Sequence, residues 1–258
     1  MQVNATPQIF LSYSWANKNI ADAIDDDFNR IGIIFQRDER DVKYTESIKD
    51  FMQRIGKSDF VVMLISDEYI KSENCMYEVT ELLNAHEFEK RILPVILSGT
   101  SIYSSNEQEK YYDYWQEKLN DALRIFSKHP QEKTIEDKKK VESIYKCLGL
   151  FFQKVTDLKL KKYEDLKSEN YQPMLDRIGF DKNIVLPDFF EIAKIEDREE
   201  QEILIEELYK KHQKNSYVLS LRAYFANKYG NYKKAKKYYL ELLSHFPESD
   251  SGHYNFAK

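Results

Sequence analysis

Glu78 is the residue in this sequence best placed to do chemistry. It closes the stretch SENCMYE, residues 72–78, near the start of an expected helix. At about 100° per residue, one apolar face of this helix contains Cys75, Met76, Val79, Leu82 and Leu83. Glu78 lies at the border of that face, so we expect it to be partly sheltered. A position in the first turn lets unpaired N–H groups and the helix dipole favour its ionised form.

Such a carboxylate can stabilise positive charge that develops during a reaction. The alternative is that Glu78 only offsets the helix dipole, a contribution of about 0.3–1 kcal/mol. Cys75, three residues earlier, is expected to be a small packing residue rather than a nucleophile.

The segments around Glu78 alternate between apolar runs and amphipathic patterns. The runs expected to be strands are QIFLSY (8–13), GIIFQ (32–36), DFVVMLIS (59–66) and RILPVIL (91–97). Alternation of this kind predicts an α/β fold with a mostly parallel sheet flanked by helices. The almost wholly apolar run 59–66 is expected to be the central strand. Pro94 indicates an edge position or a strand start for 91–97, and residues 156–160 are expected to form a last edge strand.

Ligands of open parallel sheets bind outside the carboxyl ends of the strands. Those ends are SYSW (12–15), QRDE (36–39) and SDEY (66–69). We therefore expect the functional site among these loops and the helix starts that follow them.

Beyond residue 100 the pattern changes to long helices, over 109–126 and 137–155, and the segment is expected to close near residue 180. A linker is expected over 181–190. Residues 191–258 then form a separate, all-α part.

This last part resembles a tetratricopeptide repeat. The residues on pattern positions are Ala223, Gly230, Tyr232, Ala235, Tyr239 and Pro247. Leu219 stands where tryptophan is typical. One repeat cannot bury both of its faces, so the preceding domain, another chain or further repeats must cover it.

Composition excludes several classes of function. The net charge of -5 gives no long-range attraction for nucleic acid or for an anionic membrane surface, so neither is an expected partner. No apolar run approaches the roughly 20 residues of a membrane-spanning helix, and MQVNATPQ lacks the pattern of a secretory signal. The two cysteines, Cys75 and Cys147, are expected to be thiols in a reducing cytoplasm.

The usual catalytic motifs are also missing from the sequence. It contains no glycine-rich phosphate loop, no GxSxG elbow and no histidine or cysteine pair at metal-ligand spacing, so no metal and no cofactor are expected. A phospho-receiver domain would need acids at the end of its first strand, where this chain has Ser12 and Tyr13.

Taken in order, IFLSYSW, FQRDERD, DFVVMLISDEY, KSENCMYEV and ILPVIL resemble the hallmark segments of a Toll/interleukin-1 receptor (TIR) domain, most closely those of bacterial members. The resemblance covers about residues 7–180, and its specific motifs lie within 9–97. It implies a flavodoxin-like TIR domain over residues 1–180, with the linker and the helical segment following.

The resemblance also implies an activity. Catalytic members of the family cleave the bond between nicotinamide and ribose in NAD, giving ADP-ribose or a cyclic form of it. The acid after Ser-x-x-Cys is their catalytic glutamate, and it matches Glu78. The pocket residues after Ser-Tyr match Ser14 and Trp15. The acid after the second strand matches Glu39, with Asp38 beside it.

These assignments leave alternatives open. Asn74 stands where the family often has a tryptophan, and we place it in the substrate site, where Trp15 would supply the stacking surface. Trp15 is otherwise a core or interface aromatic. Asp38 and Glu39 are otherwise a solvated turn, and the glycine common in that loop is absent.

The chemistry suits a single carboxylate. Loss of nicotinamide builds positive charge on the ribose, which an oriented Glu78 can stabilise while holding the ribose hydroxyls. Nicotinamide is already cationic and leaves without a proton. NAD is thus the expected substrate. The resemblance implies activation by self-association, with a protein partner or trigger at the C-terminal helices, in bacterial anti-phage defence or signalling. The alternative is a non-catalytic TIR adaptor that only recruits partners.

Overall fold

The computed structural model describes residues 7–31, 33–37, 58–84, 87–158, 160–179, 191–192 and 194–247. The strands are β1 (Ile9–Tyr13), β2 (Phe35–Gln36), β3 (Phe60–Ile65), β4 (Ile92–Ile96) and β5 (Lys161–Lys162). The N-terminal helices are η1 (Trp15–Asn17), α1 (Lys18–Arg30), α4 (Asp67–Lys71), α5 (Glu73–Asn84) and α6 (Phe88–Arg91). They are followed by α7 (Ser105–Lys128), α8 (Glu132–Thr156), α9 (Tyr163–Ser168), α10 (Gln172–Arg177), α12 (Arg198–Lys211), α13 (Ser216–Lys228) and α14 (Tyr232–His245).

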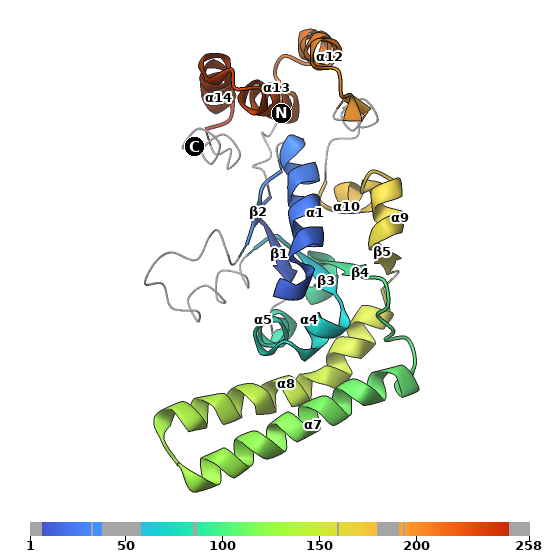
Figure 1. Ribbon diagram of the computed structural model, residues 1–258, viewed down its shortest axis with the longest axis vertical. Helices are drawn as coiled ribbons and strands as arrows, with labels where there is room; N and C mark the ends of the chain where they lie inside the picture. The colour runs from blue at the N-terminus through green and yellow to red at the C-terminus, as the bar shows by residue number, and fades with distance from the viewer. Residues whose placement is uncertain are drawn as a thin grey trace. The chain divides into compact units, whose positions relative to one another are not determined.

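The five strands form one parallel sheet in the order β2-β1-β3-β4-β5 (Figure 1). In register, Ser12 of β1 lies beside Met63 of β3, and Val62 of β3 lies beside Leu93 of β4. The predicted α/β class and the central place of the run 59–66 are confirmed. An apolar run identified β3 because a central parallel strand is covered on both faces.

Two expectations about the sheet were wrong in detail. Pro94 does not mark an edge strand, since β4 pairs with both β3 and β5. The missing N–H is tolerated because β5 joins only at Val95 and Ile96, beyond the proline. The last edge strand is Lys161–Lys162, because α8 continues to Thr156.

One hydrophobic core joins β1, β3 and β4 to α4, α5, α7 and α8. Its largest fully buried side chains include Phe10, Tyr69, Tyr111, Trp115 and Phe152. The Trp115 indole Nε1 donates to the Ile70 carbonyl at 2.8 Å, so α7 fixes the end of α4. This packing sets the position of both helices that follow β3.

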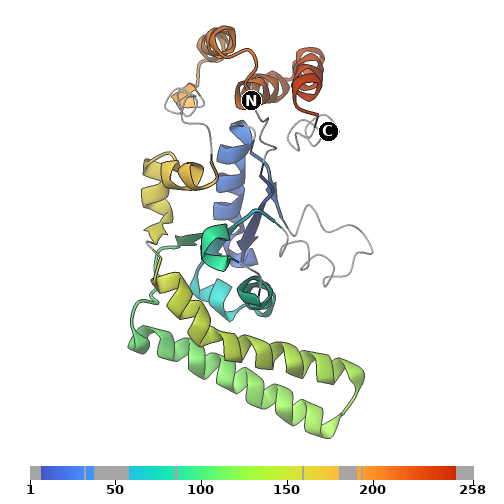
Figure 2. The ribbon, with the colours of Figure 1, turned by 180° about the vertical axis from the view of Figure 1, so that it is seen from behind.

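Helices α7 and α8 form a long antiparallel hairpin, as both views show (Figure 1 and Figure 2). Ser104 and Glu107 begin α7 with a capping box. The half of the hairpin near the sheet belongs to the core. In the distal half, from Gln116 to Lys140, a fully described stretch, no side chain is buried.

The regular elements of the C-terminal part are all helices in the residues that the structure describes, as predicted. Helices α13 and α14 pack as a hairpin around a small core of Leu219, Ala223, Ala235, Tyr238, Tyr239 and Leu242. Gly230 makes the turn with φ of 72°, a left-handed conformation that suits glycine. Tyr232 is 72% exposed. The tetratricopeptide assignment stays a resemblance.

The contacts divide the chain into two compact units. One contains residues 9–18 and 36–168, and the other contains residues 1–8, 19–35 and 169–258. Within the second unit, the Tyr224 hydroxyl bonds to Asp26 of α1 at 3.0 Å. The predicted linker, 181–190, lies outside the described residues, and the three predicted segments stay predictions.

Candidate functional site

Glu78 is buried where α5 meets the carboxyl end of β1. Its side chain is 2% exposed, and its Oε2 accepts a hydrogen bond from the Ser12 hydroxyl at 2.5 Å. One turn earlier on α5, the Cys75 thiol donates to the Tyr13 carbonyl at 3.5 Å. Two residues of α5 therefore contact the last two residues of β1.

The start of α5 corrects one expectation about Glu78. The helix begins at Glu73, and the Ser72 hydroxyl accepts a hydrogen bond from the Cys75 N–H at 3.3 Å. Glu78 is thus the sixth helical residue and lies in the second turn. The dipole effect falls off within the first turn, so contacts with the sheet govern this carboxylate rather than unpaired helix amides.

A second loop closes the site from the side of β3. The Ser66 hydroxyl donates to Asn17 of η1 at 2.7 Å and accepts the N–H of Tyr69 at 3.0 Å. Tyr69 is fully buried in α4, and its hydroxyl lies 2.8 Å from the Ser12 hydroxyl. The residues that follow β3 thus contact the carboxyl end of β1 through Ser12 and the adjoining η1 through Asn17, and Ser12 in turn contacts Glu78.

The structure places the other predicted site residues around this edge. Ser14 is 8% exposed and directly precedes η1, and Trp15 is 63% exposed, which excludes a core role within this chain. Asn74 is exposed one helical turn before Glu78, and its amide oxygen accepts from Lys140 of α8 at 3.0 Å. Asp38 and Glu39 lie outside the described residues.

Three polar side chains at the same edge, Ser12, Arg37 and Tyr69, lie in the strand-end segments where the site was expected, but the sequence did not single them out. Ser12 and Tyr69 contact each other and Ser12 contacts Glu78, but their sequence separation hides this. Arg37, just after β2, is 6% exposed and donates to the Tyr13 hydroxyl at 2.9 Å. The signal for Ser12 was a lone hydroxyl inside the apolar run IFLSY, and the signal for Tyr69 was its place in the strand-end segment SDEY.

Charge around the helix starts is set by specific pairs. Burial opposes the shift, but hydrogen bonds from Lys110 and Tyr111 hold the pKa of Asp67 below its ordinary value. The Cys147 thiol, within α8, is a weak nucleophile. Burial raises its pKa to about 12, so it stays protonated at neutral pH. Cys147 is therefore unsuited to act as a nucleophile.

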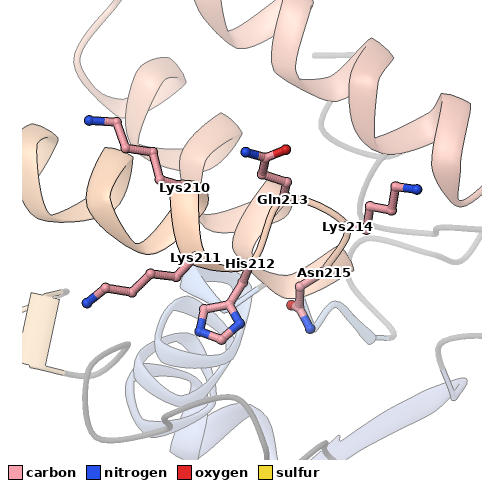
Figure 3. Close-up of a pocket in the computed structure, with 6 residues that line it drawn as sticks. All are labelled: Lys210, Lys211, His212, Gln213, Lys214 and Asn215. Atoms are coloured by element: carbon pink, nitrogen blue, oxygen red, sulfur yellow. The ribbon is translucent and has the colours of Figure 1, made fainter.

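A separate hollow surrounds the turn between α12 and α13. It is lined by Lys210, Lys211, His212, Gln213, Lys214 and Asn215. Figure 3 shows the three lysine side chains pointing in different directions. They do not converge on one point, so we assign no ligand to this hollow.

Within the described residues, no helix has the length and apolar character needed to cross a membrane. In the same residues, no three His, Cys, Asp or Glu side chains gather in a way that could hold a metal ion.

Comparison with known proteins identifies the α/β part. The model of the TIR domain family matches residues 9–126, from the first residue of β1 to near the end of α7. No curated protein and no solved structure matches the chain significantly. The matched range contains the parallel strands β1 to β4 and the helix that carries Glu78. Residues 9–126 of this chain are a TIR domain.

Proposed function

We propose that this TIR domain cleaves the bond between nicotinamide and ribose in NAD, with Glu78 as the catalytic carboxylate. TIR domains include such enzymes and also non-catalytic adaptors. The observation that carries the proposal is an oriented carboxylate at the carboxyl edge of the sheet, hydrogen-bonded to Ser12. This is the edge at which open parallel sheets bind their ligands.

The proposed step needs one acid. As the C–N bond breaks, the electron pair leaves with nicotinamide, which becomes neutral, and positive charge develops on the ribose. Glu78 stabilises that charge and accepts hydrogen bonds from the ribose hydroxyls. Water then adds to the ribose and loses a proton to give ADP-ribose, or a nucleophile of the adenine ring adds and gives a cyclic product. Trp15, with Ser14 beside it, supplies an exposed ring on which a base can stack.

The burial of Glu78 supports an enzyme that is inactive until a structural change activates it. A carboxylate that is 2% exposed cannot contact a ribose until the groups that cover it from solvent move aside. Self-association of TIR domains is the proposed trigger, with the C-terminal helices receiving a protein partner. Bacterial defence or signalling through NAD consumption would follow from that switch.

The test is nicotinamide release from NAD by the full chain over a concentration series. The wild type is expected to gain specific activity as concentration rises, and Glu78→Gln is expected to lose it at every concentration. Glu73→Gln is the matched control, since Glu73 is an exposed acid on the same helix. A folded Glu78→Gln variant that retained wild-type activity would overturn the assignment.

The second candidate is a non-catalytic adaptor. Asn74 favours it, because an exposed amide bonded to Lys140 replaces the aromatic ring often found there in the enzymes. An adaptor would release no nicotinamide even when assembled, while its oligomers would still form.

A further inference from the structure

Two buried hydroxyl groups connect Glu78 to the core. Ser12 is 1% exposed and Tyr69 is fully buried. The Ser12 hydroxyl lies 2.5 Å from Glu78 Oε2 and 2.8 Å from the Tyr69 hydroxyl. The three side chains come from β1, α4 and α5, which are separate elements of one core.

The direction of these hydrogen bonds follows from proton count. A serine hydroxyl has one proton to donate and two lone pairs with which to accept. Ser12 donates its proton to the carboxylate. The proton between Ser12 and Tyr69 must therefore come from Tyr69. The chain of donors runs from Tyr69 to Ser12 to Glu78.

We infer that Ser12 and Tyr69 are positioning residues that fix the Glu78 carboxylate for catalysis. This inference rests on the proposed function of Glu78. Neither residue needs to contact NAD in this role. Ser12 holds one carboxylate oxygen directly, and Tyr69 acts through Ser12 by keeping its proton directed at Glu78.

Both hydroxyls are held on fixed elements. Ser12 lies within β1, whose register with β3 is set on both sides of it by Leu11 and Tyr13. Tyr69 lies in α4, whose end is fixed by Trp115 through the Ile70 carbonyl. A glutamate side chain has several rotatable bonds. A hydrogen-bond donor on a rigid strand restricts these rotations and holds the carboxylate in the orientation that catalysis needs.

A pair of substitutions isolates the hydroxyl of Ser12. Thr and Val have nearly the same shape, so Ser12→Thr and Ser12→Val add the same bulk to a buried site and differ in one hydroxyl. We expect Ser12→Val to lower kcat about tenfold to hundredfold, the range for one hydrogen bond to a charged group. KM is expected to stay within about twofold, since the group does not touch substrate. Ser12→Thr is expected to recover most of kcat.

Tyr69→Phe tests the outer donor. Because Tyr69 acts through Ser12, kcat is expected to fall by a smaller factor, about threefold to tenfold. Combined with Ser12→Val, it should add little further loss, because the chain is already broken. Tyr112→Phe is the control, a hydroxyl deletion at the edge of the same core.

A measurement independent of activity separates this inference from the proposed function. The side-chain carboxyl carbon of Glu78 can be assigned by NMR from its loss in Glu78→Gln. Its resonance is expected to shift in Ser12→Val and Tyr69→Phe and to stay near the wild-type position in Ser12→Thr and Tyr112→Phe.

The outcomes are distinct. Equal kcat values and equal carboxyl resonances for folded Ser12→Thr and Ser12→Val would overturn the positioning role. Absence of nicotinamide release from the assembled wild type would refute the NAD-cleaving proposal, and the resonance pattern would then decide alone whether the hydroxyls hold the carboxylate.

Discussion

The carboxylate of Glu78 and the guanidinium of Arg222 are both largely buried, but different chemical groups surround them. Arg222, in α13, lies between the rings of Tyr209 and Tyr238, each with its centroid 3.8 Å from the guanidinium carbon. It also donates to both carboxylate oxygens of Glu206, at 2.7 and 2.9 Å. The cation is thus matched by an anion and enclosed by two aromatic faces.

At Glu78 one hydrogen-bond donor is the neutral hydroxyl of Ser12. Such a donor orients a carboxylate without cancelling its charge. The cluster around Arg222 joins three helices and pairs its cation with both Glu206 and Glu241, which suits a structural role. The chain from Tyr69 through Ser12 to Glu78 fixes a charge in place, which suits a catalytic one.

The largest expected effect is that of Glu78→Gln, which should lower activity far more than stability. Loss of the charge should reduce nicotinamide release by about 100-fold or more, as when a transition-state stabilising group is removed. The free energy of unfolding should change by less than about 1 kcal/mol, because the amide oxygen still accepts the Ser12 hydrogen bond. Steady-state assays and urea unfolding measure the two effects. A large loss of stability would make Glu78 a structural residue like Arg222.

Arg222→Met should show the reverse pattern. Loss of the paired hydrogen bonds and of both ring contacts is expected to cost about 2 kcal/mol in the C-terminal helices. Nicotinamide release per folded molecule should not change. Amide hydrogen exchange in α13 and α14 reports the destabilisation. The control is Arg198→Met, a half-exposed cation paired with Glu202 and 4.8 Å from the ring centroid of Tyr229, which is expected to cost no more than about 1 kcal/mol.

Two glycines, Gly230 in the C-terminal hairpin and Gly149 in α8, allow the same two regions to be compared in their backbone conformation. Gly230→Ala is expected to destabilise the α13–α14 hairpin by about 1 kcal/mol, because φ of 72° is costly for a residue with a side chain. Gly149→Ala in α8 should stabilise by about 0.5–1 kcal/mol, since its new methyl meets only the Tyr112 hydroxyl at an ordinary 3.6 Å. Urea unfolding of both variants checks the opposite signs, and equal signs would contradict the assigned backbone conformations.

The smallest effect concerns acid stability near the site. In the folded protein the pKa of Asp67 is held below its ordinary value. Ionised Asp67 therefore contributes to the free energy of unfolding above the unfolded pKa of about 3.9, and this contribution is lost as the pH falls through the lower folded pKa. Asp67→Asn should therefore reduce stability at pH 6 more than at pH 3. Unfolding free energies at the two pH values measure it. An equal loss at both would show that the charge of Asp67 is not involved.

Most of the sheet was predictable from the sequence because parallel strands covered on both faces appear as apolar runs. The run 59–66 predicted β3 at the centre, and 91–97 predicted β4. Pro94 predicted an edge strand because proline lacks the N–H that a paired strand donates. In the structure only the part of β4 beyond Pro94 has a neighbour on the β5 side.

The site was predictable only in part. Helix periodicity placed Glu78 at the border of an apolar face, but periodicity describes the faces of one helix and not what packs against them. Glu78 is 2% exposed and contacts Ser12 of β1, which helix periodicity could not show. Ser12 and Tyr69 were missed because their meeting depends on the register of β1 with β3 and on the position of α4.

The hairpin of α7 and α8 has a practical consequence. Its turn, residues 129–131, is exposed, and the helical stretches on either side of it contribute no buried side chain. Exposed loop tips of this kind tolerate inserted sequence. A fluorescent reporter placed there would leave the α/β core and both chain ends unmodified, and would allow clustering of the protein to be followed in living cells.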